Sequence, residues 1–145
     1  MDFRPYCVED LGTSELITIS PDTTLIECAK RMHDLCVSSL IVTSPDDSAD
    51  CPRKPEGILT DRDIVVEAIA FSLDPKVITA GDIMTCPLVT ARLDEALQVV
   101  HARMLISEIS SIVIVDERGA LVGMLEADRV RAVLRIEESA PGPSA

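Results

Sequence analysis

The sequence predicts an α+β fold built from two copies of one β-α-β-β-α unit. Three observations lead to this prediction: an internal repeat, a regular succession of strand-like and helix-like patterns within each copy, and a length of 145 residues, which suits one ordinary domain or two small halves. Hydrophobic residues make up 47% of the chain, so there is material for a buried core. We therefore expect two similar halves.

The repeat appears when the sequence is slid along itself by 72 residues. Identical and conservative pairs then run without a gap from residue 16 to residue 42. The identical pairs are Leu16/Leu88, Thr18/Thr90, Asp22/Asp94, Leu25/Leu97, Arg31/Arg103, Met32/Met104, Ser38/Ser110 and Ser39/Ser111. The offset drops to 66 at Gly57/Gly123 and Leu59/Leu125, because the first copy has a longer loop.

The first copy begins with a short strand at residues 16–19. Ser20-Pro21-Asp22 then supplies a cap, a residue suited to a first helical turn and a carboxylate for the positive helix end, so a helix is expected to start there. Its apolar positions recur three and four residues apart, at Leu25, Cys28, Ala29 and Met32. Residues 37–43, rich in β-branched side chains, predict the next strand.

A returning antiparallel strand is expected at residues 57–59, after a turn-rich loop. Thr60 or Asp61 should cap a second helix. The apolar face of that helix is predicted to be Ile64, Val65, Ala68 and Ile69.

The second copy predicts the same elements at residues 88–90, 94–104, 110–115, 121–125 and 127–136. Between the copies, Thr79-Ala80-Gly81-Asp82 resembles a capping box that opens a one-turn helix through Met84. We expect a first motif over residues 8–72, a linker with this short helix over 73–87 and a second motif over 88–136. Residues 137–145 should form a flexible tail, because they have little to bury.

Charge and composition exclude several classes of function. The formal net charge is -12, which repels nucleic-acid backbones and anionic membrane surfaces. Aromatic residues make up 2% of the chain, so base stacking on aromatic side chains is almost unavailable. No apolar stretch approaches the length of about 20 residues that spans a bilayer, and the N-terminus lacks a secretory pattern. We expect a cytoplasmic protein without nucleic-acid or membrane partners.

The five cysteines form no C-x-x-C pair, so reduced thiols are expected. Cys28, His33 and Cys36 form the only cluster that resembles a metal site. Such isolated coincidences are usually packing residues, and we expect no metal there. Nothing near a cysteine marks a lowered thiol pKa, so redox sensing is not expected either.

The repeat resembles a known family at specific motifs. These are Ile17-Thr-Ile-Ser-Pro-Asp-Thr-Thr-Leu25, then Val37-Ser-Ser-Leu-Ile-Val42, Gly57-Ile-Leu-Thr-Asp-Arg-Asp-Ile64 and Gly81-Asp-Ile-Met-Thr85, followed by the second copy. Over about residues 8–136 the chain looks like a tandem pair of cystathionine-β-synthase (CBS) domains. It is similar to the stand-alone bacterial pairs rather than to the inserts of IMP dehydrogenase or of channels.

The resemblance implies a regulatory module whose two motifs pack through their sheets with pseudo-two-fold symmetry. The cleft between them would hold adenosine-containing ligands, such as AMP, ATP or S-adenosylmethionine, with magnesium as an accompanying ion and no cofactor required. Two such pairs commonly form a homodimer, and the apolar positions expected to meet a partner copy are Ile64, Ala68, Ile69, Val130, Val133 and Leu134. An unidentified regulated protein would be a further partner.

The candidate site lies at the strand-to-helix junction of the first copy. Thr60 and Asp63 stand three residues apart in a first helical turn, so hydroxyl and carboxylate face the same way. The carboxylate can accept both hydroxyls of a ribose, while Arg62 and the free N–H groups of the helix start can meet a phosphate. The alternative is that Thr60 and Asp63 simply cap a helix.

Neighbouring residues complete the candidate set. Ile17, Val37 and Ile58 would form an apolar slot for the base. Thr18, Ser38 and Ser39 are added, although relatives often carry a basic phosphate contact where Ser38 and Ser39 stand. Compensation for phosphate charge then falls to Arg62, with Arg53 or Lys54 nearby. Asp63 is expected to be exposed in the empty cleft.

The second copy departs from this pattern. Glu126 stands where Thr60 does and Arg129 where Asp63 does, while Asp128 is one residue early, rotated by about 100° on a helix. A ribose cannot be held there in the same way, so ligand is expected chiefly in the first half.

Three classes of function are weighed. The first is a ligand-sensing regulatory module without catalysis of its own, and the second is a dimerising scaffold that has lost ligand binding. An enzyme is not expected, because His33 and His101 are unrelated by the repeat and no nucleophile elbow or P-loop is present.

Overall fold

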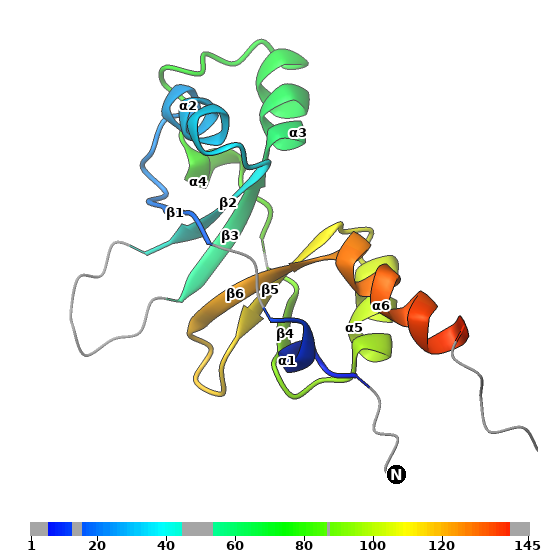
Figure 1. Cartoon of the computed structure of the whole chain (residues 1–145). Coiled ribbons are helices and arrows are strands. Elements are labelled where there is room, and N and C mark those ends of the chain that lie inside the picture. Colours follow the sequence, from blue (N-terminus) through cyan, green and yellow to red (C-terminus); the bar gives the residue numbers. More distant parts are fainter. Residues whose placement is uncertain (1–5, 13–15, 45–53, 87, 140–145) are drawn as a thin grey trace, which may run out of the picture. The chain divides into compact units, whose positions relative to one another are not determined.

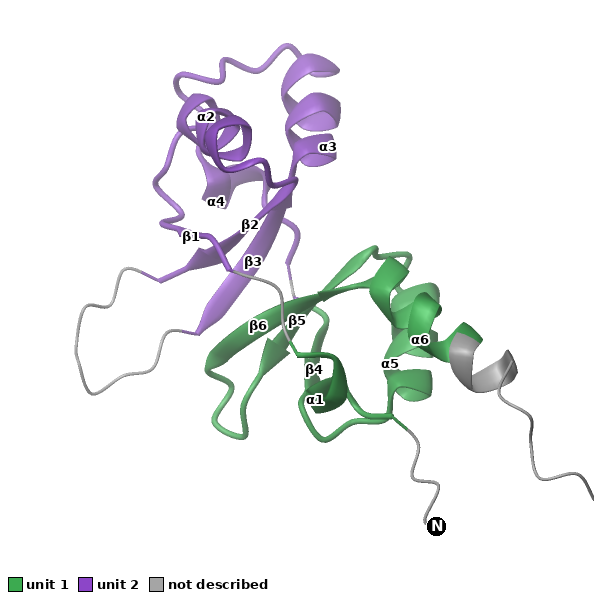
Figure 2. Cartoon of the chain, viewed as in Figure 1, with its two compact units in different colours: residues 1–15, 89–145 green, residues 16–88 purple. Residues whose placement is uncertain are grey.

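The computed structural model describes residues 6–12, 16–44, 54–86 and 88–139. The chain divides into two compact units, shown in different colours in Figure 2. Unit 1 combines Met1–Glu15 with Val89–Ala145, and unit 2 is the continuous stretch Leu16–Leu88. The mixed α+β class and the two similar halves expected from the sequence are confirmed.

Unit 2 contains a three-stranded sheet in the order β1-β2-β3 (Figure 1). Strand β1 (Thr18–Ile19) pairs parallel with β2 (Ser39–Thr43), which pairs antiparallel with β3 (Pro55–Thr60). Helix α2 (Leu25–Leu35) connects β1 to β2. Helix α3 (Asp61–Asp63) follows β3 directly and continues as the π-helical stretch η1 (Ile64–Ile69); the short helix α4 (Ala80–Ile83) comes last.

Unit 1 repeats this topology with a sheet in the order β4-β5-β6. Its elements are α1 (Val8–Leu11), β4 (Thr90–Arg92), α5 (Leu97–Ile106), β5 (Ser111–Val115), β6 (Leu121–Glu126) and α6 (Ala127–Ser139). The registers of the two sheets are equivalent residue by residue: Thr18 pairs with Ile41 and Thr90 with Val113, both shifted by the 72 residues of the sequence repeat. The repeat therefore fixes the strand pairing as well as the topology.

Each unit buries its own core between its helices and one face of its sheet. In unit 2, Leu40, Val42 and Leu59 alternate along β2 and β3 and pack with Leu25 of α2. In unit 1 the equivalent residues Ile112, Ile114, Leu125 and Leu97 do the same. Strand alternation consequently turns Ile41 and Ile58 to the sheet face away from the helices.

Several helix boundaries differ from the expectation. In the second copy, α5 begins at Leu97 and ends at Ile106, whereas residues 94–104 were expected. Helix α2 begins at Leu25, not at Ser20, because the Thr24 side chain accepts the Glu27 N–H at 3.4 Å and caps the helix. Helix α6 extends to Ser139, so the first three residues of the expected flexible tail are helical. The remaining tail residues, 140–145, lie outside the described residues.

The expected apolar face of the second helix is partly wrong. Ala68 is buried and Ile64 packs partly buried against the core, but Val65 is 54% and Ile69 72% exposed. A π-helix closes its hydrogen bonds from i to i+5, so positions chosen with a period of 3.6 residues drift off the buried side. Ala29 of α2 is also exposed.

The apolar positions expected to meet a partner copy are also corrected. Val130 and Ala68 are buried in their own cores, and Val133, Leu134 and Ile64 pack partly buried against them. Of the six, Ile69 alone is exposed.

Residues 8–11, at the start of the expected first motif, form helix α1. This helix packs in unit 1 with the second repeat, where Val8 is fully buried. The Val8 N–H donates to the Glu95 carbonyl at 3.1 Å, and the Glu9 N–H donates to the Leu93 carbonyl at 3.0 Å. Non-local backbone pairing of this kind leaves no periodicity in the sequence.

Candidate functional site

The candidate site is centred on the turn from β3 into α3 in unit 2. Thr60 keeps extended backbone angles and is the N-cap of α3. Its hydroxyl oxygen accepts the Asp63 N–H at 3.1 Å, and Asp63 Oδ2 accepts the Thr60 N–H at 2.9 Å. This reciprocal capping box holds both side chains in fixed positions at the end of the sheet.

The capping box leaves part of each side chain free to bind a ligand. The Thr60 hydroxyl still has a proton to donate, because it acts only as an acceptor toward Asp63. Within the described residues, Asp63 Oδ1 has no hydrogen-bond partner. Asp63 is half-buried, which corrects the expectation of an exposed side chain. The site therefore offers one donor and one carboxylate oxygen from a rigid turn.

Strand alternation brings four predicted site residues to one face of the sheet. Thr60 is directly opposite Ser39 in the β2–β3 pair, and Thr18 of β1 and Ile58 of β3 lie on the same face, on either side of β2. Ile41, buried between Thr18 and Ile58 in the register, was not predicted. Counting alternate residues from Ser39 along the predicted strand would have found it.

The other predicted residues lie around this face. Ile17 and Val37 pack partly buried against the core on the helix side, and the Ile17 carbonyl already accepts the Ile41 N–H at 2.9 Å. The exposed Ser38 offers its carbonyl to the Asp61 N–H at 3.0 Å, which anchors the start of α3. An apolar slot for a base remains a prediction.

Positive charge near the turn is sparse. Arg62 is exposed, and its backbone N–H donates to Asp61 Oδ1 at 2.8 Å. Lys54, expected nearby, is exposed but comes before the opposite end of β3, and Arg53 lies outside the described residues. With Asp61 and Asp63 in the same turn as Arg62, the local charge disfavours a highly charged anion.

The corresponding turn of unit 1 is built differently. Glu126 is exposed at the end of β6, and Arg129 donates from its guanidinium to the Leu11 carbonyl at the end of α1. Asp128 forms an ion pair with Arg131, one turn further along α6. No carboxylate takes the place of Asp63, and the residue that replaces it has a structural contact.

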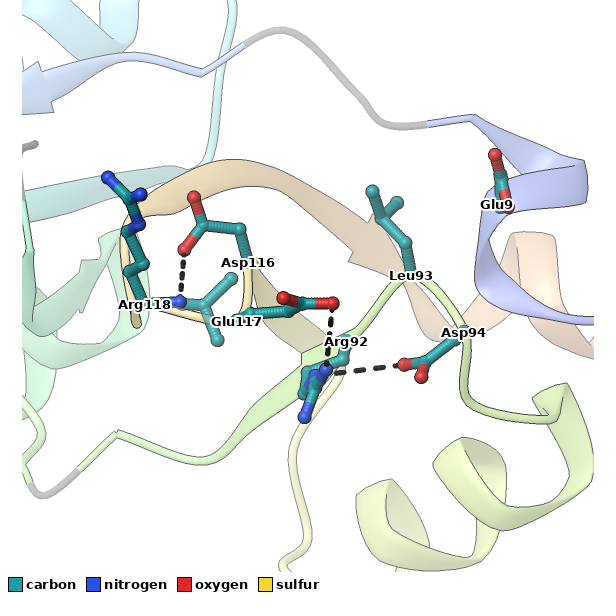
Figure 3. Close-up of a pocket in the computed structure, with 8 residues that line it drawn as sticks. Glu9, Arg92, Leu93, Asp94, Asp116, Glu117 and Arg118 are labelled. Carbon is teal, nitrogen blue, oxygen red and sulfur yellow. Dashed lines mark hydrogen bonds and ion pairs between the residues drawn. The ribbon is translucent and has the colours of Figure 1, made fainter.

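A charged hollow of about 380 Å³ lies elsewhere in unit 1, at the β5–β6 turn (Figure 3). Arg92 is between Asp94 and Glu117, at 3.7 and 3.8 Å. Asp116 Oδ1 accepts the N–H groups of Arg118 and Ala120 at 2.8 and 2.9 Å, and these bonds lower the pKa of Asp116. The polar groups that line the hollow therefore mostly form ion pairs and hydrogen bonds with one another, and these contacts stabilise the β5–β6 turn.

A bidentate ion pair stands beside this hollow. Arg103 donates to the two Glu95 oxygens at 2.9 and 2.5 Å and to the Thr90 carbonyl at 2.9 Å. These bonds lower the pKa of Glu95, chiefly through the Arg103 hydrogen bond, and raise the pKa of Arg103. Arg31, the repeat equivalent of Arg103, is exposed, so the pair is specific to the second repeat.

Glu95→Gln should lower the free energy of unfolding by about 1 kcal/mol near pH 7. Because folding lowers the Glu95 pKa, its contribution is complete above the ordinary value of 4.5 and is lost as the pH falls through the folded value. Melting temperatures of wild type and variant should therefore converge as the pH is lowered progressively below 4.5. Glu117→Gln, at an 87% exposed side chain, is the control that should change little at any pH. A difference that persists in acid would contradict this assignment.

The side chains of the cluster Cys28, His33 and Cys36 differ in solvent exposure. Cys28 is buried, and desolvation raises the pKa of its thiol to about 11. His33 and Cys36 are exposed. Over the described ranges, no group of three His, Cys, Asp or Glu side chains converges as metal ligands do.

Among the same residues, no helix is long and apolar enough to cross a membrane.

Comparison with known proteins gives one family. The CBS domain model matches residues 8–69 and 80–135. An uncharacterized protein of Methanopyrus kandleri is 28% identical over 134 residues, which are 92% of this chain and 64% of that protein. Hypoxic response protein 1 of Mycobacterium tuberculosis is 31% identical over 51% of this chain and 48% of its own length. The chain spans less than two thirds of these relatives.

Solved structures share the fold. A CBS domain protein of Pyrobaculum aerophilum complexed with AMP has a TM-score of 0.78 at 24% identity, covering 93% of this chain and 100% of that one. The CBS domain pair of protein MJ0100, in complex with 5-methylthioadenosine and S-adenosyl-L-methionine, has a TM-score of 0.77 at 24% identity, covering 92% and 99%. These likenesses establish the arrangement of strands and helices within each unit.

Proposed function

The chain belongs to the CBS domain family, and from this premise we propose that it is a regulatory module whose first repeat binds an adenosine-containing ligand at the β3–α3 turn. The observation that carries the proposal is the Thr60–Asp63 capping box, which fixes a hydroxyl donor and a carboxylate oxygen side by side. Holding these groups in place before binding reduces the entropy lost when a ligand is ordered.

The ribose is the part of the ligand that this turn fits best. Asp63 Oδ1 can accept a ribose hydroxyl in a charge-assisted hydrogen bond, while Oδ2 continues to hold the Thr60 N–H. The second hydroxyl would share the same carboxylate, as acidic residues do in dinucleotide folds. The base would then extend along the face that carries Thr18, Ser39 and Ile58.

The phosphate end has weaker support from this chain. Arg62 is the cation of the turn itself, because Lys54 comes before β3, at the opposite end of that strand, and Ser38 and Ser39 are neutral. AMP, 5-methylthioadenosine and S-adenosyl-L-methionine, the compounds bound in the similar structures, share adenosine and carry at most one phosphate. Their common part is the one that Asp63 is suited to hold.

A thermal-shift comparison tests this function. The melting temperature should be measured with AMP, ATP, S-adenosylmethionine and 5-methylthioadenosine, each with and without magnesium. 2′-Deoxy-AMP, which lacks one ribose hydroxyl, is the control for AMP. Ligand at 100 times its dissociation constant stabilises the folded state by about 2.7 kcal/mol. We expect AMP to raise the melting temperature and 2′-deoxy-AMP to do so much less. If no adenosine compound stabilises the chain, the scaffold function takes its place.

AMP should compete well against metal-free ATP. The chain carries a net charge of -12, and Asp61 and Asp63 flank the one arginine of the turn, so two further phosphates add repulsion. Calorimetry in a chelator measures the two dissociation constants directly. ATP binding tenfold tighter than AMP, about 1.4 kcal/mol, would contradict the charge argument, whereas magnesium can reverse the order by shielding the phosphates.

A homodimer is part of the proposed function. Exposed apolar side chains gather on two surfaces: one on η1 and the residues after it, Val65, Val66, Ile69 and Phe71, and one on α5, Val99 and Ile106. The α5 surface includes a mainly apolar hollow of about 520 Å³. Groups of exposed apolar residues this large are typical of protein interfaces.

At tens of micromolar, a concentration above the dissociation constant of a stable interface, light scattering should therefore give the mass of two chains. Ile69→Glu and Ile106→Glu introduce a charge on each surface separately, at side chains that are 72% and 85% exposed and do not support a core. At least one should produce monomers. A wild-type monomer, or dimers unaffected by both variants, would refute this assembly.

A further inference from the structure

The short helices α1 and α4 dock in equivalent ways on the two units. Residues 6–12 lie against unit 1, and residues 78–84, which are 72 positions later, lie against unit 2. Three backbone hydrogen bonds recur at this offset. In unit 1 they run from Leu97 N–H to Tyr6 C=O at 2.9 Å, from Val8 N–H to Glu95 C=O at 3.1 Å and from Glu9 N–H to Leu93 C=O at 3.0 Å. The equivalent bonds in unit 2 run from Leu25 N–H to Ile78 C=O at 3.0 Å, from Ala80 N–H to Thr23 C=O at 2.8 Å and from Gly81 N–H to Pro21 C=O at 2.9 Å.

The local chemistry of the two helices is equivalent as well. The Cys7 N–H donates to Asp10 Oδ2 at 2.9 Å, and the Thr79 N–H donates to Asp82 Oδ2 at 3.0 Å, so each helix starts with the same carboxylate contact. Val8 and Ala80, the first residues of the helices, are both 0% exposed. Thus α1, which precedes the first repeat in sequence, completes the core of unit 1, and α4, which precedes the second repeat, completes the core of unit 2.

The two helices differ in how they are attached to the chain. α4 belongs to unit 2 together with the continuous sequence before it. α1 reaches its position in unit 1 from the N-terminal end of the chain, since its bonds to the Leu93–Leu97 segment join residues 84 to 91 positions apart in sequence. It also has a bond that α4 lacks: Arg129 donates to the Leu11 carbonyl, whereas the equivalent Asp63 is bonded to Thr60.

We propose that unit 1 contains a peptide-binding groove, formed by the β4–α5 connection and the first turn of α6, and that residues 6–12 occupy it as a separable strap. Cys7 and Ala96 form an isolated antiparallel bridge, so recognition resembles strand addition over one residue pair, with backbone hydrogen bonds supplying affinity and one buried side chain supplying specificity. Val8 fills the apolar position and Arg129 fixes the strap's last carbonyl. The ligand class is a short peptide with an apolar residue followed two positions later by aspartate. Such a strap can be supplied in trans by a peptide or by a second copy.

The chain offers a selective probe for this groove. Tyr6 is its only tyrosine and there is no tryptophan, so in a Tyr6→Phe chain all tyrosine fluorescence comes from an added peptide of residues 1–13. The full-length chain with Tyr6→Phe and Val8→Asp has a disabled strap, because Val8→Asp buries a charge at a 0% exposed position. The Tyr6→Phe chain, with its strap in place, is the matched control.

Peptide anisotropy should rise saturably with the Val8→Asp chain and at least about tenfold more weakly with the control chain, whose own strap competes. A Val8→Ala peptide should bind roughly tenfold more weakly than wild type and a Val8→Asp peptide not detectably, because the buried apolar contact is lost. A Glu9→Gln peptide should bind within about threefold of wild type, because Glu9 is exposed and engages the groove through its backbone N–H. Equal binding to both chains, or by all peptides, would overturn the proposal.

Hydrogen exchange gives a second test that does not depend on the Val8→Asp chain folding. In the full-length Arg129→Gln chain, the Val8 and Glu9 amides should exchange at least about tenfold faster than in wild type, because the strap opens more often. The Ala80 and Gly81 amides of unit 2 should keep their rates. Unchanged exchange at Val8 and Glu9, or an equal increase in both units, would show that residues 6–12 are not a separately held strap.

Discussion

Asp63→Ala should lower the affinity of the chain for AMP at least tenfold. The substitution removes the carboxylate that the Thr60–Asp63 capping box would hold toward a ribose, and a hydrogen bond to a charged acceptor is worth roughly 1.5–3 kcal/mol. The same change removes the acceptor of the Thr60 N–H, so the melting temperature without ligand should also fall, by the equivalent of about 0.5–2 kcal/mol. Calorimetry and thermal unfolding measure the two effects separately.

Two control variants separate binding from capping. Asp63→Asn keeps an amide oxygen that can accept the Thr60 N–H but removes the charge, so it should retain most of the stability and lose most of the affinity. Asp82→Ala removes a similar carboxylate contact from α4, outside the proposed site, so it should lose stability and keep affinity. If Asp82→Ala weakens AMP as much as Asp63→Ala does, the affinity loss reports damage to the fold.

Gly57→Ala should destabilise the chain by about 1–3 kcal/mol. A Cβ on Gly57 would lie 2.5 Å from Met84 Sδ and 3.1 Å from the Thr85 carbonyl oxygen. The thioether can move, but the Thr85 backbone is held on β3 by two hydrogen bonds with Ile58, of 2.9 and 3.2 Å. Urea unfolding of wild type and variant at one pH gives the difference in unfolding free energy.

A double-mutant cycle identifies the cause of this loss. Met84→Ala alone should be destabilising, because Met84 packs against the unit 2 core. Combined with Gly57→Ala, it should cost less than the sum of the two single changes, since the new methyl group no longer meets the thioether. If the two losses of unfolding free energy simply add, the Met84 side chain is not what a methyl group on Gly57 clashes with.

Much of the fold could be predicted from the sequence because a repeat carries register as well as topology. The 72-residue offset between Ser38/Ser39 and Ser110/Ser111 anticipates two sheets with the same pairing, and the structure has it. The Thr79–Asp82 and Thr60–Asp63 capping boxes were also accessible, because they depend on residues only three apart.

The features that sequence reasoning missed depend on distant residues or on an unusual backbone. The docking of residues 6–12 on unit 1 uses backbone groups, which carry no side-chain signature, although extending the 72-residue offset backwards from residue 16 pairs Asp10 with Asp82 and would have indicated it. The π-helical winding of η1 displaced Val65 and Ile69 from the predicted buried face. The Glu95–Arg103 pair joins a loop to a helix, so neither partner predicts the other.

The sequence predicts those parts of the candidate site that depend on residues close together in the chain. Thr60 and Asp63 were identified by spacing and by family resemblance, and strand alternation puts Thr18, Ser39 and Ile58 on the face beside them. Ile17 and Val37 pack toward the core, a distinction that a short strand with apolar residues at successive positions does not reveal. The role of Arg129 required the position of Leu11, which only the folded chain provides.

Calorimetric titration with AMP of wild type, Asp63→Asn and Glu126→Ala tests the central claim most directly. We predict about one site per chain in wild type and at least tenfold weaker binding for Asp63→Asn. Affinity for Glu126→Ala should be within about twofold of wild type or slightly higher, because Glu126 belongs to the other unit and its removal makes an acidic chain less negative. Two equivalent sites per chain, or binding lost in Glu126→Ala and kept in Asp63→Asn, would contradict a ligand site in the first repeat.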